Sequence, residues 1–251
     1  MIKVVLLGAG NVAYHLAKAF QESSNIDFVQ HFRRNRAKDA DFDSNISKTD
    51  RLNTLAKADI YVIAINDDAI SSFSKQLDLD HGLVVHTSGS MPLNALKCKA
   101  NKGVFYPLQT FSVTKNINFK EVPIAIETED EKDFELLEQF ARSLSDMVYE
   151  INSEQREKLH IAAVFANNFS NQMFKIAKDI CDEYAISFDL LKPIIKETVG
   201  KLETLNPKQA QTGPAKRNDR KVIEKHLSQL SGEQKEIYAL ISASITRTFK
   251  N

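Results

Sequence analysis

Three small residues near the start of the chain, Gly8, Gly10 and Ala13, have the types and spacing of a phosphate-binding turn. They follow an apolar, β-branched run at residues 3–7 and precede a stretch with helical spacing of apolar residues. Glycine at position 8 allows a tight turn, glycine at position 10 lets the backbone approach a pyrophosphate, and Ala13 lets the helix pack closely on the strand. Strand, glycine turn and helix together predict a dinucleotide site rather than a purely structural turn. Its expected contacts, which include unpaired N–H groups of the helix terminus, are Gly8, Gly10, Asn11 and Val12.

Basic residues close the next expected strand, residues 26–32. In a dinucleotide fold the end of this strand meets the adenosine ribose. An acidic residue there accepts the 2′-OH of NAD, whereas an arginine accommodates the 2′-phosphate of NADP. The sequence has no Asp or Glu between Phe28 and Arg36, so we expect NADP(H) rather than NAD(H), with a solvated basic turn as the alternative. The expected phosphate contacts are Arg33, Arg34 and Asn35.

Polar residues follow two further apolar strands, expected at residues 60–65 and 83–86. Ligands of open α/β sheets bind outside the carboxyl ends of the strands. Asn66 is therefore expected beside the cofactor, whereas Asp68 is expected to cap a helix at residues 69–77. After the second strand, hydroxyls and backbone N–H groups form a natural site for a carboxylate. The expected substrate-binding residues are His86, Thr87, Ser88 and Ser90, together with Gln109 beyond a strand at residues 103–106.

From Ser153 onward the strand signals stop and the sequence has helical periodicity. Ser153 is the expected N-cap of a helix that runs to about Tyr184. Between residues 159 and 180 this helix is apolar nearly all round, which is typical of a helix buried on several sides. It is expected to form the centre of a helical domain or the core of a dimer.

Polar side chains interrupt this apolar helix. Asn167 and Asn171 stand seven and eleven residues after His160, so all three are expected on one helical face. Imidazole titrates near neutrality, which makes His160 the expected proton donor or acceptor, with His86 as the alternative base. Asn167 and Asn168 are expected to orient a substrate, with Asn171 beside them. A structural polar network between helices is the alternative.

A polar loop at residues 206–214 is the other unusual stretch of this half. It is either an ordered connection or a segment that brings Gln211 and Thr212 to the substrate.

The order of these elements predicts the fold class. Strands alternating with helices over about 150 residues indicate a doubly wound, Rossmann-type, mainly parallel α/β sheet, followed by an all-α region. We expect a nucleotide-binding domain at residues 1–152 and a helical substrate and dimerisation domain at residues 153–251.

Composition excludes several classes of protein. The 251 residues include 33 basic and 33 acidic side chains, so the net charge suggests neither nucleic acid nor an anionic membrane as partner. No apolar run reaches the ~20 residues of a membrane helix, and no signal peptide precedes the first strand. Cys98 and Cys181 fit no zinc or redox spacing. We expect a cytoplasmic protein with reduced thiols and no metal.

Five segments together carry a resemblance to a known family: GAGNVA at residues 8–13, HTSGS at 86–90, PLQTFS at 107–112, LHIAAVFANNF at 159–169 and QTGP at 211–214. They resemble bacterial Rossmann-like NADP oxidoreductases with a helical C-terminal domain of unknown function. More distantly, the chain is similar to pyrroline-5-carboxylate reductase, ketopantoate reductase and the β-hydroxyacid dehydrogenases. The resemblance implies NAD(P)-dependent hydride transfer in a cleft between two domains, and homodimers built through the helical domain.

One catalytic feature of these relatives is missing. Ketopantoate reductase and the β-hydroxyacid dehydrogenases carry a lysine one helical turn before an asparagine, whereas Ala163 and Val164 stand one turn before Asn167 and Asn168. Pyrroline-5-carboxylate reductase has no such lysine. Tyr106-Pro107 also stands where prephenate dehydrogenase-like proteins have His-Pro.

These observations support two hypotheses of different classes. The first is an NADP(H)-dependent oxidoreductase acting on a small, carboxylate-bearing carbonyl, alcohol or imine, with the cofactor carrying the chemistry. The second is a non-catalytic NADP-binding sensor or scaffold that acts through its helical dimer, for which the missing lysine is the main support.

Overall fold

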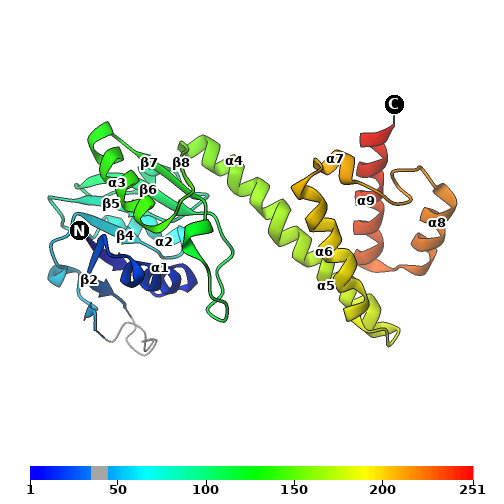
Figure 1. Ribbon diagram of the computed structural model, residues 1–251, viewed down its shortest axis with the longest axis horizontal. Coiled ribbons are helices and arrows are strands. Elements are labelled where there is room, and N and C mark those ends of the chain that lie inside the picture. Colours follow the sequence, from blue (N-terminus) through cyan, green and yellow to red (C-terminus); the bar gives the residue numbers. More distant parts are fainter. Residues whose placement is uncertain (35–44, 251) are drawn as a thin grey trace. The chain divides into compact units, whose positions relative to one another are not determined.

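The chain forms two compact units, Met1–Asn167 and Asn168–Asn251. A computed structural model describes residues 1–34 and 45–250 (Figure 1). The first unit contains a large sheet, and the described part of the second contains helices without strands. The expected fold class, a Rossmann-type α/β sheet followed by an all-α region, is therefore confirmed. The domain boundary after residue 152 stays a prediction.

The sheet of the first unit is mainly parallel, in the order β3-β2-β1-β4-β5-β6-β7-β8. Only β6 and β7 run antiparallel among these neighbouring pairs. The order reverses between β1 and β4, and such a switch point is where open α/β sheets bind ligands. The elements are β1 (Ile2–Leu7), α1 (Asn11–Glu22), β2 (Ile26–Phe32), β3 (Ser47–Thr49), β4 (Ile60–Ile63), α2 (Asp67–Ser74), β5 (Leu83–His86), β6 (Asn101–Pro107), β7 (Ile124–Thr128), α3 (Glu131–Leu144) and β8 (Val148–Glu150).

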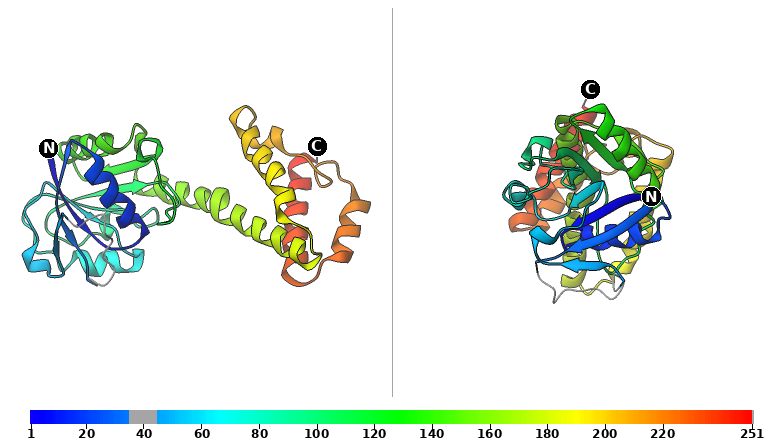
Figure 2. Two further views of the ribbon diagram at one scale, coloured as in Figure 1. Left: turned by 60° about the horizontal axis from the view of Figure 1, so that its bottom comes forward. Right: turned by 90° about the vertical axis from the view of Figure 1, so that its left-hand side faces the viewer.

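Both faces of the sheet are buried, and successive residues of β1 point to opposite faces. Leu6 belongs to the core that contains Phe20 of α1 and Phe140 of α3, whose ring centroids lie 5.5 Å apart. Leu7 belongs to the other core, with Phe73 of α2. Figure 2 shows the twisted sheet with helices packed around it. Burial on both faces explains why the strands are continuous apolar runs rather than alternating ones.

Two helices begin differently from expectation. Helix α2 starts at Asp67, so Asp68 lies within its first turn and is not the cap. Asn152, rather than Ser153, caps α4 (Ser153–Ala163), because the Asn152 side chain and Gln155 form a reciprocal capping box. Ser153 instead directs its hydroxyl and its backbone N–H to the carboxylate of Glu127.

The long helix expected to continue to Tyr184 is interrupted. A π-helical turn, Val164–Phe169, separates α4 from α5 (Ser170–Glu183). In a π turn each residue rotates the chain by less than in an α-helix. The prediction that His160, Asn167 and Asn171 share one face assumes uniform α-helical spacing. That spacing ends at Ala163.

The prediction that this helix is buried on several sides is wrong for the single chain. Phe165 is 65% exposed and Phe169 is 48% exposed. Within the described part of the second unit, only Cys181 and Ala215 are buried. This unit therefore has almost no core of its own. Its remaining helices are α6 (Lys192–Gly200), α7 (Pro207–Ala210), α8 (Arg220–Gln229) and α9 (Gly232–Phe249).

None of the described helices combines the length and the apolar character needed to span a membrane.

Candidate functional site

The glycine turn lies where β1, β2 and β4 end. The backbone N–H of Gly8 donates to the carbonyl of Phe32 at 3.1 Å, and Ala64 donates to Leu7 at 2.8 Å. Gly8 has a φ of +145°, and a Cβ at this position would lie 2.0 Å from the carbonyl oxygen of Ala64. Glycine is therefore required here both by the backbone conformation and by the neighbouring strand.

The second glycine has a different surrounding. Gly10 is the N-cap residue of α1, its φ is −84°, and a Cβ there would meet no atom within 4 Å. Among residues 1–34 and 45–250 no side chain caps this helix N-terminus, and its first turn carries no acidic residue. The N–H groups of the first turn are thus free to bind an anion, with the positive end of the helix dipole behind them.

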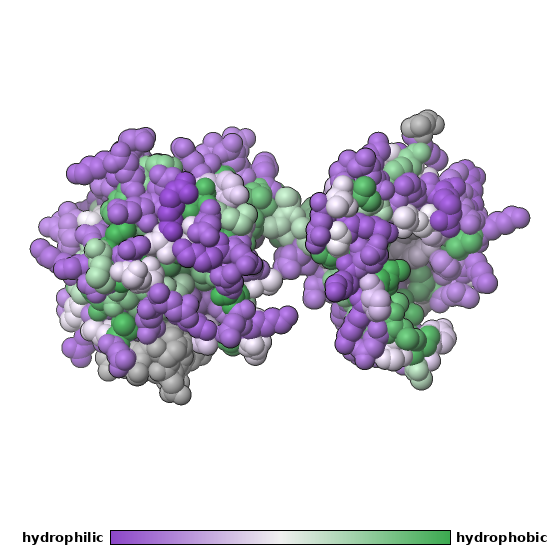
Figure 3. Space-filling model, viewed as in Figure 1, coloured by the Kyte–Doolittle hydropathy of each residue, from purple (hydrophilic) through white to green (hydrophobic). Residues whose placement is uncertain are grey.

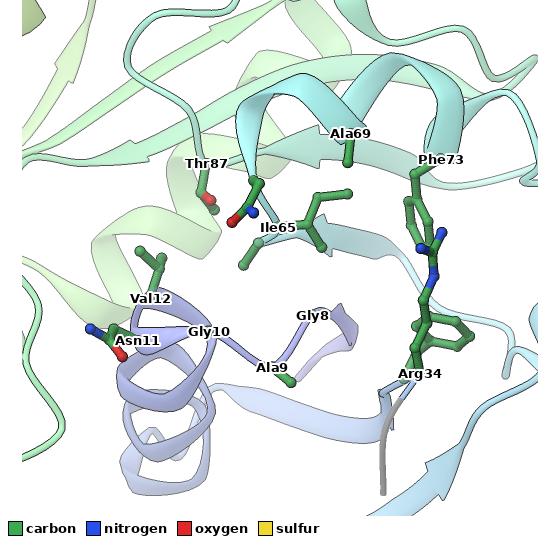
Figure 4. Close-up of a pocket in the computed structure, with 13 residues that line it drawn as sticks. Gly8, Ala9, Gly10, Asn11, Val12, Arg34, Ile65, Ala69, Phe73 and Thr87 are labelled. Carbon is green, nitrogen blue, oxygen red and sulfur yellow. The ribbon is translucent and has the colours of Figure 1, made fainter. Parts of the chain in front are cut away.

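A cavity of about 660 Å³ opens in front of this turn (Figure 4). Its volume is within the range of small-molecule and cofactor sites, roughly 300–1,000 Å³. Its position at the switch point of the sheet, its glycine turn and its open helix terminus fit the pyrophosphate of a dinucleotide. The lining residues are Gly8, Ala9, Gly10, Asn11, Val12, Phe32, Arg34, Ala64, Ile65, Asn66, Ala69, Phe73 and Thr87.

The two arginines at the end of β2 have different roles. Arg34 lines the cavity, and its guanidinium carbon lies 5.7 Å from the centroid of the Phe73 ring. Figure 4 shows the Arg34 side chain standing beside this ring at the cavity wall. Such stacking holds a guanidinium in place while its N–H groups stay available for phosphate. Asn35 lies outside the described residues.

Arg33 is 4% exposed and supports the glycine turn through His31. Its Nη2 lies 3.0 Å from Nδ1 of His31, and Nε2 of His31 lies 2.7 Å from the carbonyl oxygen of Gly8. A carbonyl can only accept, so Nε2 of His31 carries a proton and Nδ1 accepts from Arg33. These described partners give Arg33 a structural role at the turn, and its contact with a phosphate stays a prediction.

The hydroxyl loop after β5 is held largely by its own hydrogen bonds. Thr87 lines the cavity, and its hydroxyl donates to the carbonyl of Ile63 at 3.3 Å. The oxygen of Ser88 accepts from the backbone N–H groups of Ser90 and Met91. The hydroxyl of Ser90 donates to Asp67 at 2.5 Å. Ser88 and Ser90 therefore shape the loop, which leaves Thr87 as the loop hydroxyl at the cavity wall.

His86 is fully buried and supports the same loop. Its Nδ1 accepts from the N–H of Ser88, and its Nε2 lies 3.3 Å from the carbonyl oxygen of Pro92. Burial, aided by the positive charge of Arg156, lowers the pKa of His86 to about 4. Both ring nitrogens have partners within the loop, and the role of His86 as the alternative base stays a prediction.

The low pKa of His86 predicts acid sensitivity. The unfolded chain gains a proton on this ring near pH 6.5, but the folded chain gains it only near pH 4. Stability is therefore lost as the pH falls from about 6.5 to about 4, by up to about 3 kcal/mol from this group. Urea unfolding of His86→Gln should show a shallower loss over this range than the wild type.

Tyr106 and His160 form a pair that sequence reasoning did not assemble. The Tyr106 hydroxyl lies 3.2 Å from Nδ1 of His160, and the two rings meet edge to face with centroids 6.2 Å apart. Gly89 lies against both, since a Cβ there would be 2.6 Å from Cζ of Tyr106 and 2.7 Å from Nδ1 of His160. The available signals were the Tyr106-Pro107 pair at a strand end and a glycine inside a hydroxyl string.

Comparison with known proteins identifies both parts of the chain. Residues 3–89 match the family model "NADP oxidoreductase coenzyme F420-dependent", and residues 122–245 match "Domain of unknown function (DUF2520)". A "putative NADP oxidoreductase" from Bacteroides fragilis is 37% identical, with 98% of each chain covered and a TM-score of 0.88. The chain belongs to this family of Rossmann-like NADP oxidoreductases with a DUF2520 C-terminal domain.

More distant structures share the fold of this oxidoreductase. A protein from Thermotoga maritima is 19% identical, with 98% of each chain covered and a TM-score of 0.76. Pyrroline carboxylate reductase from Plasmodium falciparum, solved with NADP bound, is 13% identical, with a TM-score of 0.64 and coverage of 99% of this chain and 98% of that one. No curated protein matches the sequence. Family and fold together support an NAD(P)-dependent oxidoreductase that binds a nicotinamide cofactor, and they do not favour a non-catalytic sensor.

The other expected site residues of the oxidoreductase belong to both units. Asn167 is exposed in the first unit, and Gln109 uses its side-chain oxygen to accept from the N–H of Thr110. In the second unit Asn168 and Asn171 are exposed. In that unit Gln211 donates to the carbonyl of Thr212, and Thr212 borders a cavity of about 280 Å³ between apolar helix faces. Roles of these residues in binding substrate stay predictions.

No group of three or more potential metal ligands occurs among the residues that the structure describes.

Proposed function

We propose that the protein transfers a hydride between NADP(H) and a small carboxylate-bearing carbonyl, alcohol or imine compound. The observation that carries this proposal is the cavity at the switch point of the sheet, with the glycine turn on one side and Arg34 on the other. The nicotinamide supplies or accepts the hydride when the cofactor is bound. The protein must bind the dinucleotide, orient the substrate and exchange one proton with it.

Arg34 supports NADP as the preferred cofactor. Its guanidinium stands at the end of β2, where the adenosine ribose is bound in this fold. The residues that line the described cavity include no Asp or Glu, the side chains that would accept the 2′-OH of NAD. A planar guanidinium can instead bind the 2′-phosphate through two N–H groups.

Cofactor titration tests this assignment. The wild type should bind NADPH at least about tenfold more tightly than NADH, as one charge-assisted hydrogen bond of about 1.5–3 kcal/mol implies. Arg34→Ala should abolish that difference by weakening NADPH alone, measured through nicotinamide fluorescence. The exposed Arg51, changed to Ala, serves as the control and should leave both affinities unchanged. Equal affinities in the wild type would refute the role of Arg34. Binding of neither nucleotide would refute the proposed function.

The substrate would lie beyond the carboxyl ends of β5 and β6. Thr87 brings a hydroxyl to the cavity wall, where it would exchange its bond to the Ile63 carbonyl for one to a substrate carboxylate, and Ser88 and Ser90 keep the loop in shape. His160 is the proposed proton donor or acceptor. Turnover of keto acids and cyclic imines with NADPH would support this substrate class, whereas binding of NADPH without turnover of any of them would favour the sensor.

A homodimer through the helical unit is part of the proposal. The described part of Asn168–Asn251 buries only two residues, and large apolar side chains lie on its surface (Figure 3). A unit of this size with so small a core does not by itself balance the entropy of folding. A second copy would cover apolar side chains such as Leu190, Val199 and Leu240, which are 71%, 60% and 69% exposed.

This dimer predicts stability that depends on concentration. Tenfold dilution should lower the apparent free energy of unfolding by about 1.4 kcal/mol if folding and association are coupled. Sedimentation at micromolar concentration should give a dimer, and Leu240→Glu should shift it towards monomer. Val113, exposed on a loop of the first unit, provides a control as Val113→Glu, which should remain dimeric. A folded wild-type monomer at this concentration would contradict the proposal.

A further inference from the structure

Tyr106 and His160 come from separate elements that meet at the edge of the sheet used by the cofactor. Tyr106 is near the carboxyl end of β6, which runs parallel to β5, and His160 is in α4 of the same unit. Tyr106 is 9% exposed, whereas His160 is only partly buried. Gly89, two residues after Thr87 of the cavity wall, touches both side chains. The pair therefore lies beside the loop whose Thr87 lines the proposed nucleotide site.

The hydrogen bond of the pair leaves one ring nitrogen available. Nδ1 of His160 faces the Tyr106 hydroxyl, and no other polar atom of the described residues is bonded to the ring. Burial raises the pKa of Tyr106, so the phenol keeps its proton at neutral pH and can donate it to Nδ1. Neutral His160 then carries its own proton on Nε2.

A phenol suits this position because it can reverse its role. Its oxygen donates to Nδ1 when the neutral imidazole carries its proton on Nε2, and it accepts from Nδ1–H when the imidazole is charged or has given up its Nε2 proton. The ring orientation is thus preserved while His160 gains or loses a proton. A carbonyl or a carboxylate at the same place would favour only a ring that carries a proton on Nδ1.

We infer that Tyr106 and His160 form a proton-handling pair, in which Nε2 of His160 exchanges the proton of the substrate and the Tyr106 hydroxyl positions the ring. In the direction of reduction, the hydride forms a C–H bond at the carbonyl or imine carbon, and the π electrons move to the oxygen or nitrogen. Charged His160 gives its Nε2 proton to that atom and becomes neutral, with its remaining proton on Nδ1, which then donates to the Tyr106 oxygen. His160 is the catalytic residue and Tyr106 the positioning residue. This inference rests on the proposed function.

Gly89 provides the space that the pair needs. Any side chain there would press on Cζ and the hydroxyl of Tyr106 and on Nδ1 of His160, because a Cβ would come within 2.6–2.8 Å of all three atoms. Gly89→Ala should therefore separate the two rings or displace the loop. Gly200→Ala is the matched control, since a Cβ at Gly200 would meet nothing within 4 Å.

The tautomer of His160 provides a test that does not depend on catalysis. Nitrogen-15 spectra of the labelled full-length protein distinguish Nδ1–H from Nε2–H, and His160→Gln identifies the His160 signals. We expect Nε2–H to dominate in the wild type. Tyr106→Phe should lower the Nε2–H to Nδ1–H ratio by about fivefold, the effect of one neutral hydrogen bond. Tyr149→Phe, at a half-exposed tyrosine, should leave the ratio unchanged.

Turnover measurements separate this inference from the proposed function. With any keto acid or cyclic imine that the wild type reduces, His160→Gln should lower kcat by about a hundredfold or more, while NADPH affinity is retained. Tyr106→Phe should lower kcat less and leave KM nearly unchanged. An unaltered tautomer ratio in Tyr106→Phe, or wild-type kcat in His160→Gln, would overturn the inference. Failure of the wild type to reduce any compound in the presence of bound NADPH would refute the proposed function instead.

Discussion

Replacing Gly8 with alanine is expected to destabilise the nucleotide-binding unit by several kcal/mol. The φ of +145° at Gly8 is a conformation that costs a residue with a side chain about 1–3 kcal/mol. The new Cβ would also lie 2.0 Å from the carbonyl oxygen of Ala64, which belongs to the backbone and cannot rotate away. Relief requires β1 and β4 to separate, and overpacking of this kind adds about 1–3 kcal/mol. Urea unfolding followed by circular dichroism measures the loss.

Gly10→Ala is the matched comparison for this prediction. The φ of Gly10 is −84° and a Cβ there meets no atom, so the change should alter stability by less than about 1 kcal/mol. Its methyl group would instead occupy the cavity surface where the pyrophosphate is expected. NADPH affinity should therefore fall by about tenfold or more while the fold persists. Wild-type stability of Gly8→Ala, or wild-type NADPH affinity of Gly10→Ala, would contradict the roles assigned to the two glycines.

Removal of Arg156 is expected to be the most damaging change of a charged residue. Arg156 is 1% exposed, pairs with Glu127 and donates to the carbonyl of Met91 at 2.7 Å. It thereby connects β7, α4 and the loop after β5. Arg156→Met leaves the Glu127 carboxylate, whose side chain is 18% exposed, without its counter-charge. Breaking one partner of a buried pair costs about 3–5 kcal/mol, measured by chemical unfolding.

Two further variants test whether the loss of the ion pair causes this destabilisation. The double variant Arg156→Met/Glu127→Gln removes the unpaired carboxylate and should be less destabilised than the sum of the single changes. Arg142→Met breaks an exposed pair with Glu138, one turn apart on α3, and should cost at most about 0.5 kcal/mol. If Arg156→Met behaved like Arg142→Met, the buried pair would not stabilise the site as described.

The fold class could be predicted from the sequence because its signals are local. Residues 3–20 contain a strand, a glycine turn and a helix without interruption. Burial on both sheet faces produces continuous apolar runs, which can be recognised in the sequence. The structure adds that Gly8 is required by contact with Ala64, which stands 56 positions later and cannot be recognised from spacing.

The roles of neighbouring residues were harder to predict. Successive side chains at a strand end point to opposite sides, so Arg33 and Arg34 cannot both face one cavity in the same way. Which of them does so depends on the surroundings: His31 binds Arg33, and Phe73 packs against Arg34. Similarly, the string of hydroxyls after β5 indicated a site, but only their partners show that Ser88 and Ser90 hold the loop itself.

The sequence by itself determined the order of elements, the nucleotide-binding turn, the basic end of β2 and His160 as a candidate proton carrier. The tertiary structure decided that His160 lies beside Tyr106, 54 positions earlier, and that His86 is fully buried. It also decided that the residues of the apolar helix between 159 and 180 are at most partly buried within the described chain. The physical reason is that sequence periodicity predicts which face of a helix or strand tends to be buried. The atoms that cover that face, or that complete a hydrogen bond, come from distant parts of the chain or from a second molecule.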